Sequence, residues 1–191
     1  MNAKSLLSLL YLSSPALPIG AFAYSQGLES AIELEWVTDD DDLSKWLHGV
    51  LNHGLAQQDL PLFYRLYQGW IDGDLASINY WNNTFRATRE SAELLMEDEQ
   101  LGRSLKRLLI SLDRITADEI PPNAGFFTLY ALAAVRFDIE PDEAALGLCW
   151  SWLENQVTVA CKTIPLGQTA AQKVMIPMME KIDKAVHYAK Q

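Results

Sequence analysis

Apolar side chains recur along most of this 191-residue chain at the spacing of one face of an α-helix. The i, i+3, i+4, i+7 pattern is clearest in Leu43–Leu51, Leu62–Trp70 and Leu105–Leu112. No stretch alternates apolar and polar residues convincingly over the length of a strand. The pattern therefore predicts an all-α protein, a compact single-domain bundle of roughly eight to ten helices over residues 1–191.

The expected helices follow from this periodicity and from the turn residues between them. They are Ala3–Leu12, Ser25–Leu34, Asp39–Gly54, Ala56–Gly69, Asp74–Thr84, Phe85–Met96, Gln100–Ile115, Ala124–Phe137, Pro141–Cys161 and Pro165–Ala189. Thr38 with Asp41 resembles a capping box, and Pro141 and Pro165 suit first helical positions. Pro177 is expected to kink the last helix or to split it in two.

The segment Ser14–Glu29 fits neither a plain helix nor a solvated loop. Pro15 and Pro18 are unsuited to a helix interior, because proline lacks an N–H donor and its ring clashes with the preceding turn. The residues between Leu17 and Tyr24 are nevertheless largely apolar. The segment must therefore pack against the core of the chain or against a partner.

The composition of the chain limits both its expected cellular location and the kinds of partner that it can bind. The net charge of −10 argues against nucleic acid and against an anionic membrane surface, and favours a basic protein among possible partners. No apolar run is long enough for a membrane-spanning helix. Two cysteines do not make a disulfide framework, so the cytoplasm is the expected location.

The sequence contains no signature of catalysis. The motifs GxxxxGK[ST], GxGxxG, GxSxG and HExxH are absent, so we expect neither an enzyme nor a bound cofactor. His48 and His53 lie about 140° apart around a helix, and Cys149 and Cys161 lie about 18 Å apart along one predicted helix. No metal site is therefore predicted, and both cysteines are expected to be buried as small apolar residues.

For three further groups of residues, a structural interpretation is favoured over a functional one. The pattern favours a solvated helix face for the acids Glu90, Glu93, Glu97, Asp98 and Glu99. Arg86 and Arg89 are expected to tie helices together through a buried acid such as Glu90 or Glu29. Core packing is favoured over an apolar-ligand site for most of the tryptophans, which are Trp36, Trp46, Trp70, Trp81, Trp150 and Trp152.

A second informative segment lies near the C-terminus, around Pro165. Gln168 and Gln172 are four positions apart and therefore lie one turn apart on the same helix face. Their amides suit the binding of a backbone or the orientation of water, since an amide is neither a general acid nor a general base. The alternative is an amide pair that bonds the proline-containing connection.

Several short motifs follow one another along the chain. They are Leu17-Pro18-Ile19-Gly20, Phe22-Ala23-Tyr24-Ser25-Gln26-Gly27-Leu28-Glu29, Thr88-Arg89-Glu90, Gly102-Arg103 and Pro165-Leu166-Gly167-Gln168 with Gln172. In order and spacing, over essentially its whole length, the chain resembles the UreF family of urease accessory proteins. Lys162 stands where such proteins often carry an arginine, and it keeps the charge but not the planar fork.

The resemblance implies a non-enzymatic, all-α, dimeric assembly factor. Such a protein binds the accessory protein UreD, called UreH in some bacteria, and the pair recruits the GTPase UreG to deliver nickel to apo-urease. The residues expected at partner contacts are Tyr24, Ser25, Gln26, Glu29, Lys162, Gln168 and Gln172. The alternative is a strict GTPase-activating protein that inserts Lys162 or Gln168 at the GTP site.

Overall fold

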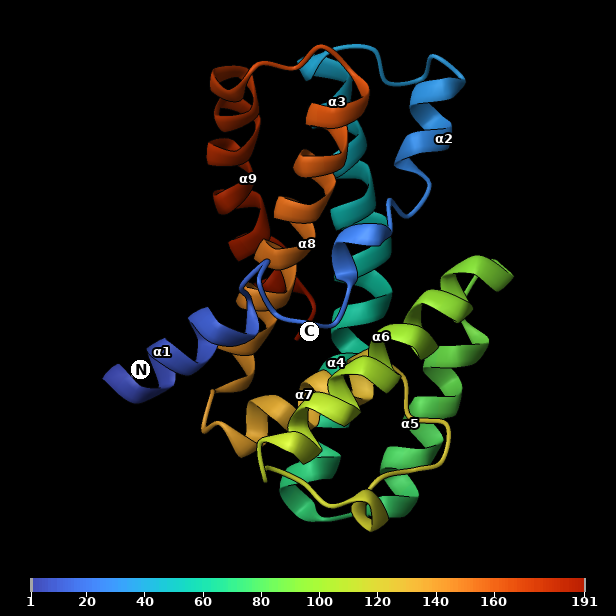
Figure 1. Ribbon diagram of the computed structural model, residues 1–191, viewed down its shortest axis with the longest axis vertical. Helices are drawn as coiled ribbons and strands as arrows, with labels where there is room; N and C mark the ends of the chain where they lie inside the picture. The colour runs from blue at the N-terminus through green and yellow to red at the C-terminus, as the bar shows by residue number, and fades with distance from the viewer. Residues whose placement is uncertain (1, 191) are drawn as a thin grey trace.

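The computed structural model describes residues 2–190, and within them it contains helices and turns but no β-strand (Figure 1). This confirms the all-α prediction. The α-helices are α1 (Ala3–Leu12), α2 (Leu28–Glu33), α3 (Asp40–Gly49), α4 (Leu60–Asp72), α5 (Leu75–Ala87), α6 (Ala92–Ser111), α7 (Phe126–Arg136), α8 (Pro141–Thr163) and α9 (Gln168–Tyr188). Two short 3₁₀ turns, η1 (Ala21–Ala23) and η3 (Ala117–Glu119), and a π-helical stretch, η2 (Val50–Asp59), complete the chain.

The helices form two groups at opposite ends of the molecule (Figure 1). Helices α2, α3, α8 and α9 make one end, and α4, α5, α6 and α7 make the other. The two groups are joined by one long helical rod, in which α3, η2 and α4 follow without a break. The α2–α3 loop and the α8–α9 loop lie at the same end of the molecule (Figure 1).

The long rod corrects the expected break between Gly54 and Ala56. Gly54 costs only about 1 kcal/mol inside a helix, and buried neighbours on the same face compensate for it. The N–H of Leu60 donates to the carbonyl of Leu55, five residues back, so the π-helical winding continues to the start of α4. Pro61 then falls in the first turn of α4, where its missing donor is tolerated.

The break between the fifth and sixth helices also lies elsewhere than expected. Helix α5 continues to Ala87, and α6 runs through the region where the sequence predicted a break after Met96. The hydroxyl of Thr88 donates to the carbonyl of Phe85 at 2.8 Å as α5 ends. Ser91 then caps α6 by accepting from the N–H of Leu94 at 3.2 Å. Side-chain capping, rather than apolar spacing, sets this boundary.

Two further helix starts differ from the prediction by a few residues. Asp39, not Thr38, caps α3, and its side chain accepts from the N–H of Asp42 at 2.9 Å. Pro141 does occupy the first position of α8. Pro165 instead precedes α9, which begins at Gln168.

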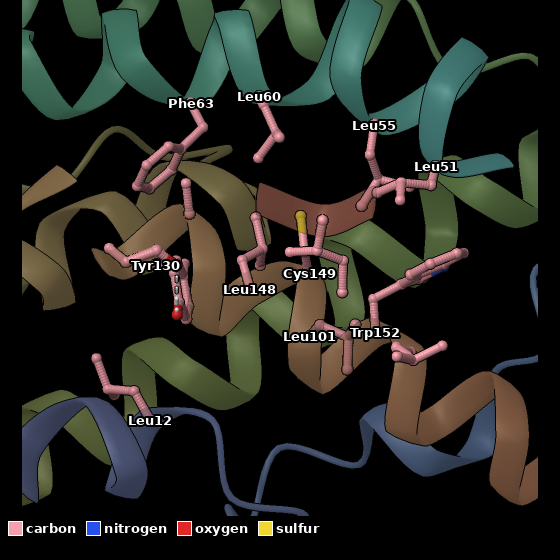
Figure 2. Packing of buried hydrophobic residues seen from close by; sticks show 14 of the residues in the cluster. Leu12, Leu51, Leu55, Leu60, Phe63, Leu101, Tyr130, Leu148, Cys149 and Trp152 are labelled. Carbon is pink, nitrogen blue, oxygen red and sulfur yellow. Dashed lines mark hydrogen bonds between the residues drawn. The ribbon is translucent and has the colours of Figure 1, made fainter. Parts of the chain in front are cut away.

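One part of the hydrophobic core lies between the long rod and α8, and the core continues into α6, α7 and α9. Figure 2 shows side chains of the rod pointing toward α8; those labelled on the rod are Leu51, Leu55, Leu60 and Phe63, and those on α8 are Leu148, Cys149 and Trp152. Cys149 is fully buried as expected, whereas Cys161 is exposed near the end of α8, which corrects that prediction. Trp152 is buried, but Trp36 is 66% exposed and does not belong to the core.

Helix α9 carries Pro177 in its interior and continues past it to Tyr188. The residue therefore does not divide α9 into two elements. Proline removes one helical hydrogen bond. Buried residues on both sides, Val174, Met175, Met178 and Ile182, pack this helix against the rest of the fold.

Candidate functional site

A cavity of about 490 Å³ lies where the N-terminal connection passes over the middle of the bundle. Its walls come from the segment between Leu12 and Gln26, from η2 and from helices α6, α7 and α8. Most of the lining is apolar, including Leu101, Phe126 and Leu148. Five charged residues line the same space, and they are Asp59, Arg89, Glu90, Glu97 and Asp98. The cavity therefore combines an apolar wall with a buried polar cluster.

The ion pair of Arg89 with Asp59 ties the α5–α6 connection to the end of η2. Two guanidinium nitrogens of Arg89 donate to the two carboxylate oxygens of Asp59, and the guanidinium carbon lies 4.1 Å from the centroid of the Phe85 ring. Burial raises the pKa of Asp59, and the charge of Arg89 opposes that shift. The expected partners of the arginines were therefore wrong: Arg89 pairs with Asp59, and Arg86 pairs with Glu99 at 2.6 Å.

Gln26 fastens the N-terminal connection over the cavity. Its amide nitrogen donates to Glu97 Oε1 at 2.8 Å, and its amide oxygen accepts from the indole N–H of Trp152 at 3.0 Å. The backbone at Gln26 is left-handed, with φ of 51°. Burial raises the pKa of Glu97 to about 7, the hydrogen bond from Gln26 lowers it in part, and the neighbouring Asp98 adds to the rise.

Asp98 caps a neighbouring helix from outside that helix. Helix α7 has Gly125 at its N-cap, which offers no side chain, and Asp98 Oδ1 accepts from the N–H of Phe126 at 2.9 Å instead. A Cβ at Gly125 would lie 1.8 Å from Asp98 Oδ2, so only glycine fits beside this carboxylate. Burial raises the pKa of Asp98 to about 6, against the backbone donors of Phe126 and Phe127.

Asn82 and Gly102 contact the turn before α7, the same turn that Asp98 caps. The Asn82 amide oxygen accepts from the N–H of Gly125 at 3.1 Å and from the hydroxyl of Thr128 at 2.7 Å. Its amide nitrogen donates to the carbonyl of Asn123 at 3.1 Å. A Cβ at Gly102 would lie 2.8 Å from the Gly125 carbonyl carbon, so this glycine lets α6 approach the turn closely.

The structure divides the sequence-predicted contact residues into two groups. Tyr24 and Gln26 line the central cavity; Tyr24 and Ser25 are half-buried, and Gln26 is exposed at the edge of the chain's surface. The other group is exposed and consists of Glu29 on α2, Lys162 in the last turn of α8, and Gln168 and Gln172 in the first turns of α9.

The two glutamines on α9 do not bond the proline-containing connection. Both side chains are exposed, and the amide of Gln172 contacts only the sulfur of Met175, at 3.9 Å, among its hydrogen-bond partners within residues 2–190. Both amides lie at the surface, and their role in partner contacts stays a prediction.

Sequence reasoning missed the buried acids of the cavity. Glu97 and Asp98 were expected on a solvated face, yet both are buried. Their spacing could have indicated this burial, because Glu97 and Asp98 fall between Leu94 and Leu101 on the apolar helix face that continues to Leu105. Asp59 shows the same pattern, because it comes four residues after Leu55 on the buried face of the rod. An acid on an apolar stripe is the pattern that indicates a buried polar cluster.

Within residues 2–190, no group of three or more His, Cys, Asp or Glu side chains is placed to hold a metal ion. None of the helices described is both long enough and apolar enough to cross a membrane.

Comparison with known proteins assigns the chain to a family. The model of the UreF family matches residues 37–178, which is most of the chain. The chain therefore belongs to the UreF family. Its curated relatives bear the name urease accessory protein UreF.

The relatives cover nearly all of the chain at high identity. The protein of Teredinibacter turnerae is 49% identical over 189 residues, covering 97% of this chain and 85% of the relative. That of Chromohalobacter salexigens is 47% identical over 186 residues, covering 97% of this chain and 81% of the relative. That of Hahella chejuensis is 45% identical over 192 residues, covering 100% of this chain and 86% of the relative. The family assignment thus includes both informative segments of the sequence.

Proposed function

We propose that this chain is an adaptor in urease maturation. It binds a UreD- or UreH-type accessory protein, and the pair recruits a UreG-type GTPase so that GTP hydrolysis is coupled to nickel delivery to apo-urease. The observation that carries the proposal is membership of the UreF family, with identity near 47% over 97% of the chain. In this role the chain works in the cytoplasm as a homodimer within the complex, without catalysing a reaction of its own.

The exposed contact residues support an adaptor. Lys162 lies at the surface and forms no ion pair with another described residue, so its charge is available to a partner carboxylate or phosphate. Gln168 and Gln172 present two amides on one exposed face of α9. Gln26, in contrast, is engaged with Glu97 and Trp152, so in this proposal it shapes the scaffold.

Retention of purified partners tests the adaptor. The tagged full chain is expected to retain the UreD-type protein, and then the UreG-type GTPase. Lys162→Ala and the double variant Gln168→Ala/Gln172→Ala are expected to lower retention while the melting temperature stays unchanged, because all three side chains are exposed. Lys184→Ala, which alters an exposed lysine elsewhere on α9, is the matched control. Failure of the unaltered chain to retain either partner would refute the adaptor.

A strict GTPase-activating role is the second candidate, and it is favoured by the exposed charge of Lys162, which forms no ion pair with another described residue. A cation inserted at the GTP site raises hydrolysis by orders of magnitude, about 10³-fold or more in known arginine-finger cases. The test is GTP turnover by the purified UreG-type protein with and without this chain. A large acceleration that is lost in Lys162→Ala supports activation, and an unchanged rate with intact binding supports the adaptor alone.

A further inference from the structure

Two large apolar side chains are exposed at the end of the molecule where α2 turns into α3. Trp36 is 66% exposed and Leu34 is 59% exposed. They lie in residues 33–42, which we call the tip segment (Figure 1, the α2–α3 connection). An exposed tryptophan beside an exposed leucine leaves an apolar surface that nothing in residues 2–190 covers.

The backbone holds Trp36 in a defined position. Helix α2 ends in a Schellman motif, in which the N–H of Trp36 donates to the carbonyl of Ala31 at 2.8 Å and the N–H of Glu35 donates to that of Ile32 at 3.0 Å. Trp36 therefore presents its ring from a fixed turn. Beside it lies an open hollow of about 420 Å³, whose apolar lining includes Trp36, Val37, Trp46 and Val50.

The tip segment beside this hollow is strongly acidic, and the charged residues that line the hollow itself are Asp42 and Lys45. Six of the ten residues of the tip segment are acids, and none is basic. Asp39–Asp42 are explained by the N-terminus of α3, where negative charge is favourable. Glu33 and Glu35 are not, because they lie at the C-terminal end of α2, where the helix dipole disfavours them. The nearby Lys45 already pairs with Asp42 at 3.1 Å.

We propose that the tip segment docks a basic segment of a partner protein. One large apolar side chain of that segment enters the hollow beside Trp36, and flanking Lys or Arg side chains meet Glu33, Glu35 and the acids of α3. Charge complementarity selects this occupant. A second copy of this chain carries the same net charge of −10, and anionic lipids or nucleic acids would be repelled. This inference does not depend on the role in urease maturation.

Peptide binding to the full chain tests the proposal. The probe is a short fluorescent peptide in which one leucine stands between runs of lysine and arginine, and binding is followed by fluorescence anisotropy at two salt concentrations. Trp36→Ser is expected to weaken binding about tenfold or more, because the leucine of the peptide loses the aromatic ring against which it packs. Glu33→Gln/Glu35→Gln is expected to weaken binding and to reduce its salt dependence. The control, Glu140→Gln/Asp183→Asn, removes two exposed acids elsewhere and is expected to leave affinity nearly unchanged.

Four outcomes would overturn the proposal. Equal affinity of Trp36→Ser and the unaltered chain would show that the hollow is not the site. Equal affinity for a peptide whose leucine is replaced by serine, or equal weakening by the control variant, would reduce the effect to general charge attraction. Sedimentation showing a dimer that Trp36→Ser dissociates would assign the hollow to a second copy. Trp36-dependent binding to phosphatidylserine vesicles would assign it to a membrane.

Discussion

Replacing Glu97 by glutamine should stabilise the protein at alkaline pH. Glu97 is buried beside the cavity, and its carboxylate accepts a hydrogen bond from the amide of Gln26. A glutamine of the same shape still accepts that bond through its own amide oxygen. Glu97→Gln therefore removes the cost of burying a charge and keeps the contact that fastens the N-terminal connection.

The size and sign of the effect follow from the pKa of Glu97. Burial raises that pKa from 4.5 to about 7. Below pH 4.5 the carboxyl group is protonated in both states and costs nothing. Between pH 4.5 and 7 the unfolded chain loses the proton while the folded chain retains it, so stability falls as pH rises. Above pH 7 this decrease in the free energy of unfolding is complete, and it amounts to about 3 kcal/mol.

Urea unfolding followed by tryptophan fluorescence, at intervals from pH 4.5 to pH 8.5, measures this effect. The free energy of unfolding of Glu97→Gln should exceed that of the unaltered chain by about 2–3 kcal/mol at pH 8, and the difference should vanish near pH 4.5. Glu140→Gln, at an exposed position, controls for the substitution itself. A destabilised Glu97→Gln at pH 8, or a difference that does not change with pH, would refute the reasoning.

Three further substitutions probe the polar cluster through the free energy of unfolding in urea. Asn82→Leu removes a buried donor and acceptor that hold the turn before α7, and should lower stability by about 2–4 kcal/mol. Gly125→Ala places a methyl group against the Asp98 carboxylate and should cost about 2 kcal/mol or more, visible also as a lower melting temperature. Arg89→Met leaves the carboxylate of Asp59 buried without its cation and should cost about 3–5 kcal/mol.

Matched controls separate these effects from substitution in general. An alanine at Gly49 meets no atom within 4 Å, so Gly49→Ala should be neutral or stabilising. Arg103→Met removes an arginine whose side chain is largely exposed, and should change stability by less than about 1 kcal/mol. If the control variants lose as much stability as Gly125→Ala and Arg89→Met, the close contact and the buried pair are not the cause.

The fold class could be read from the sequence, because helical periodicity is a property of the chain itself. The predicted ranges Ala3–Leu12 and Pro141–Cys161 lie close to α1 and α8. The failures lie where apolar spacing continues across a boundary or where a glycine interrupts a continuous helix. The true end of α5 depends on the capping side chains of Thr88 and Ser91, which hydrophobic periodicity does not register.

The candidate site was only partly visible in the sequence. Gln26 was predicted at a partner contact, and the sequence did not indicate its hydrogen bonds to Glu97 and Trp152, which are 71 and 126 positions away. Such pairings depend on the packing of helices that are distant in the sequence. Asp59 was overlooked because an acid is expected at the surface unless its partner is known, and that partner, Arg89, lies 30 residues further on.

The π-helical stretch determines which way the long rod faces. Leu43, Leu47, Leu51, Leu55, Asp59 and Phe63 repeat at intervals of four and are all buried. In a regular α-helix, positions four apart advance about 40° around the axis at each step, so such a row would rotate out of the core. A π-helix has more than four residues per turn, and it turns the row back in the opposite direction. The π-helical winding thus keeps residues four positions apart on the buried face, and it places Asp59 where it can pair with Arg89. Deleting one residue from η2 would rotate everything beyond it by somewhat less than about 90° and would turn that carboxylate away from its partner.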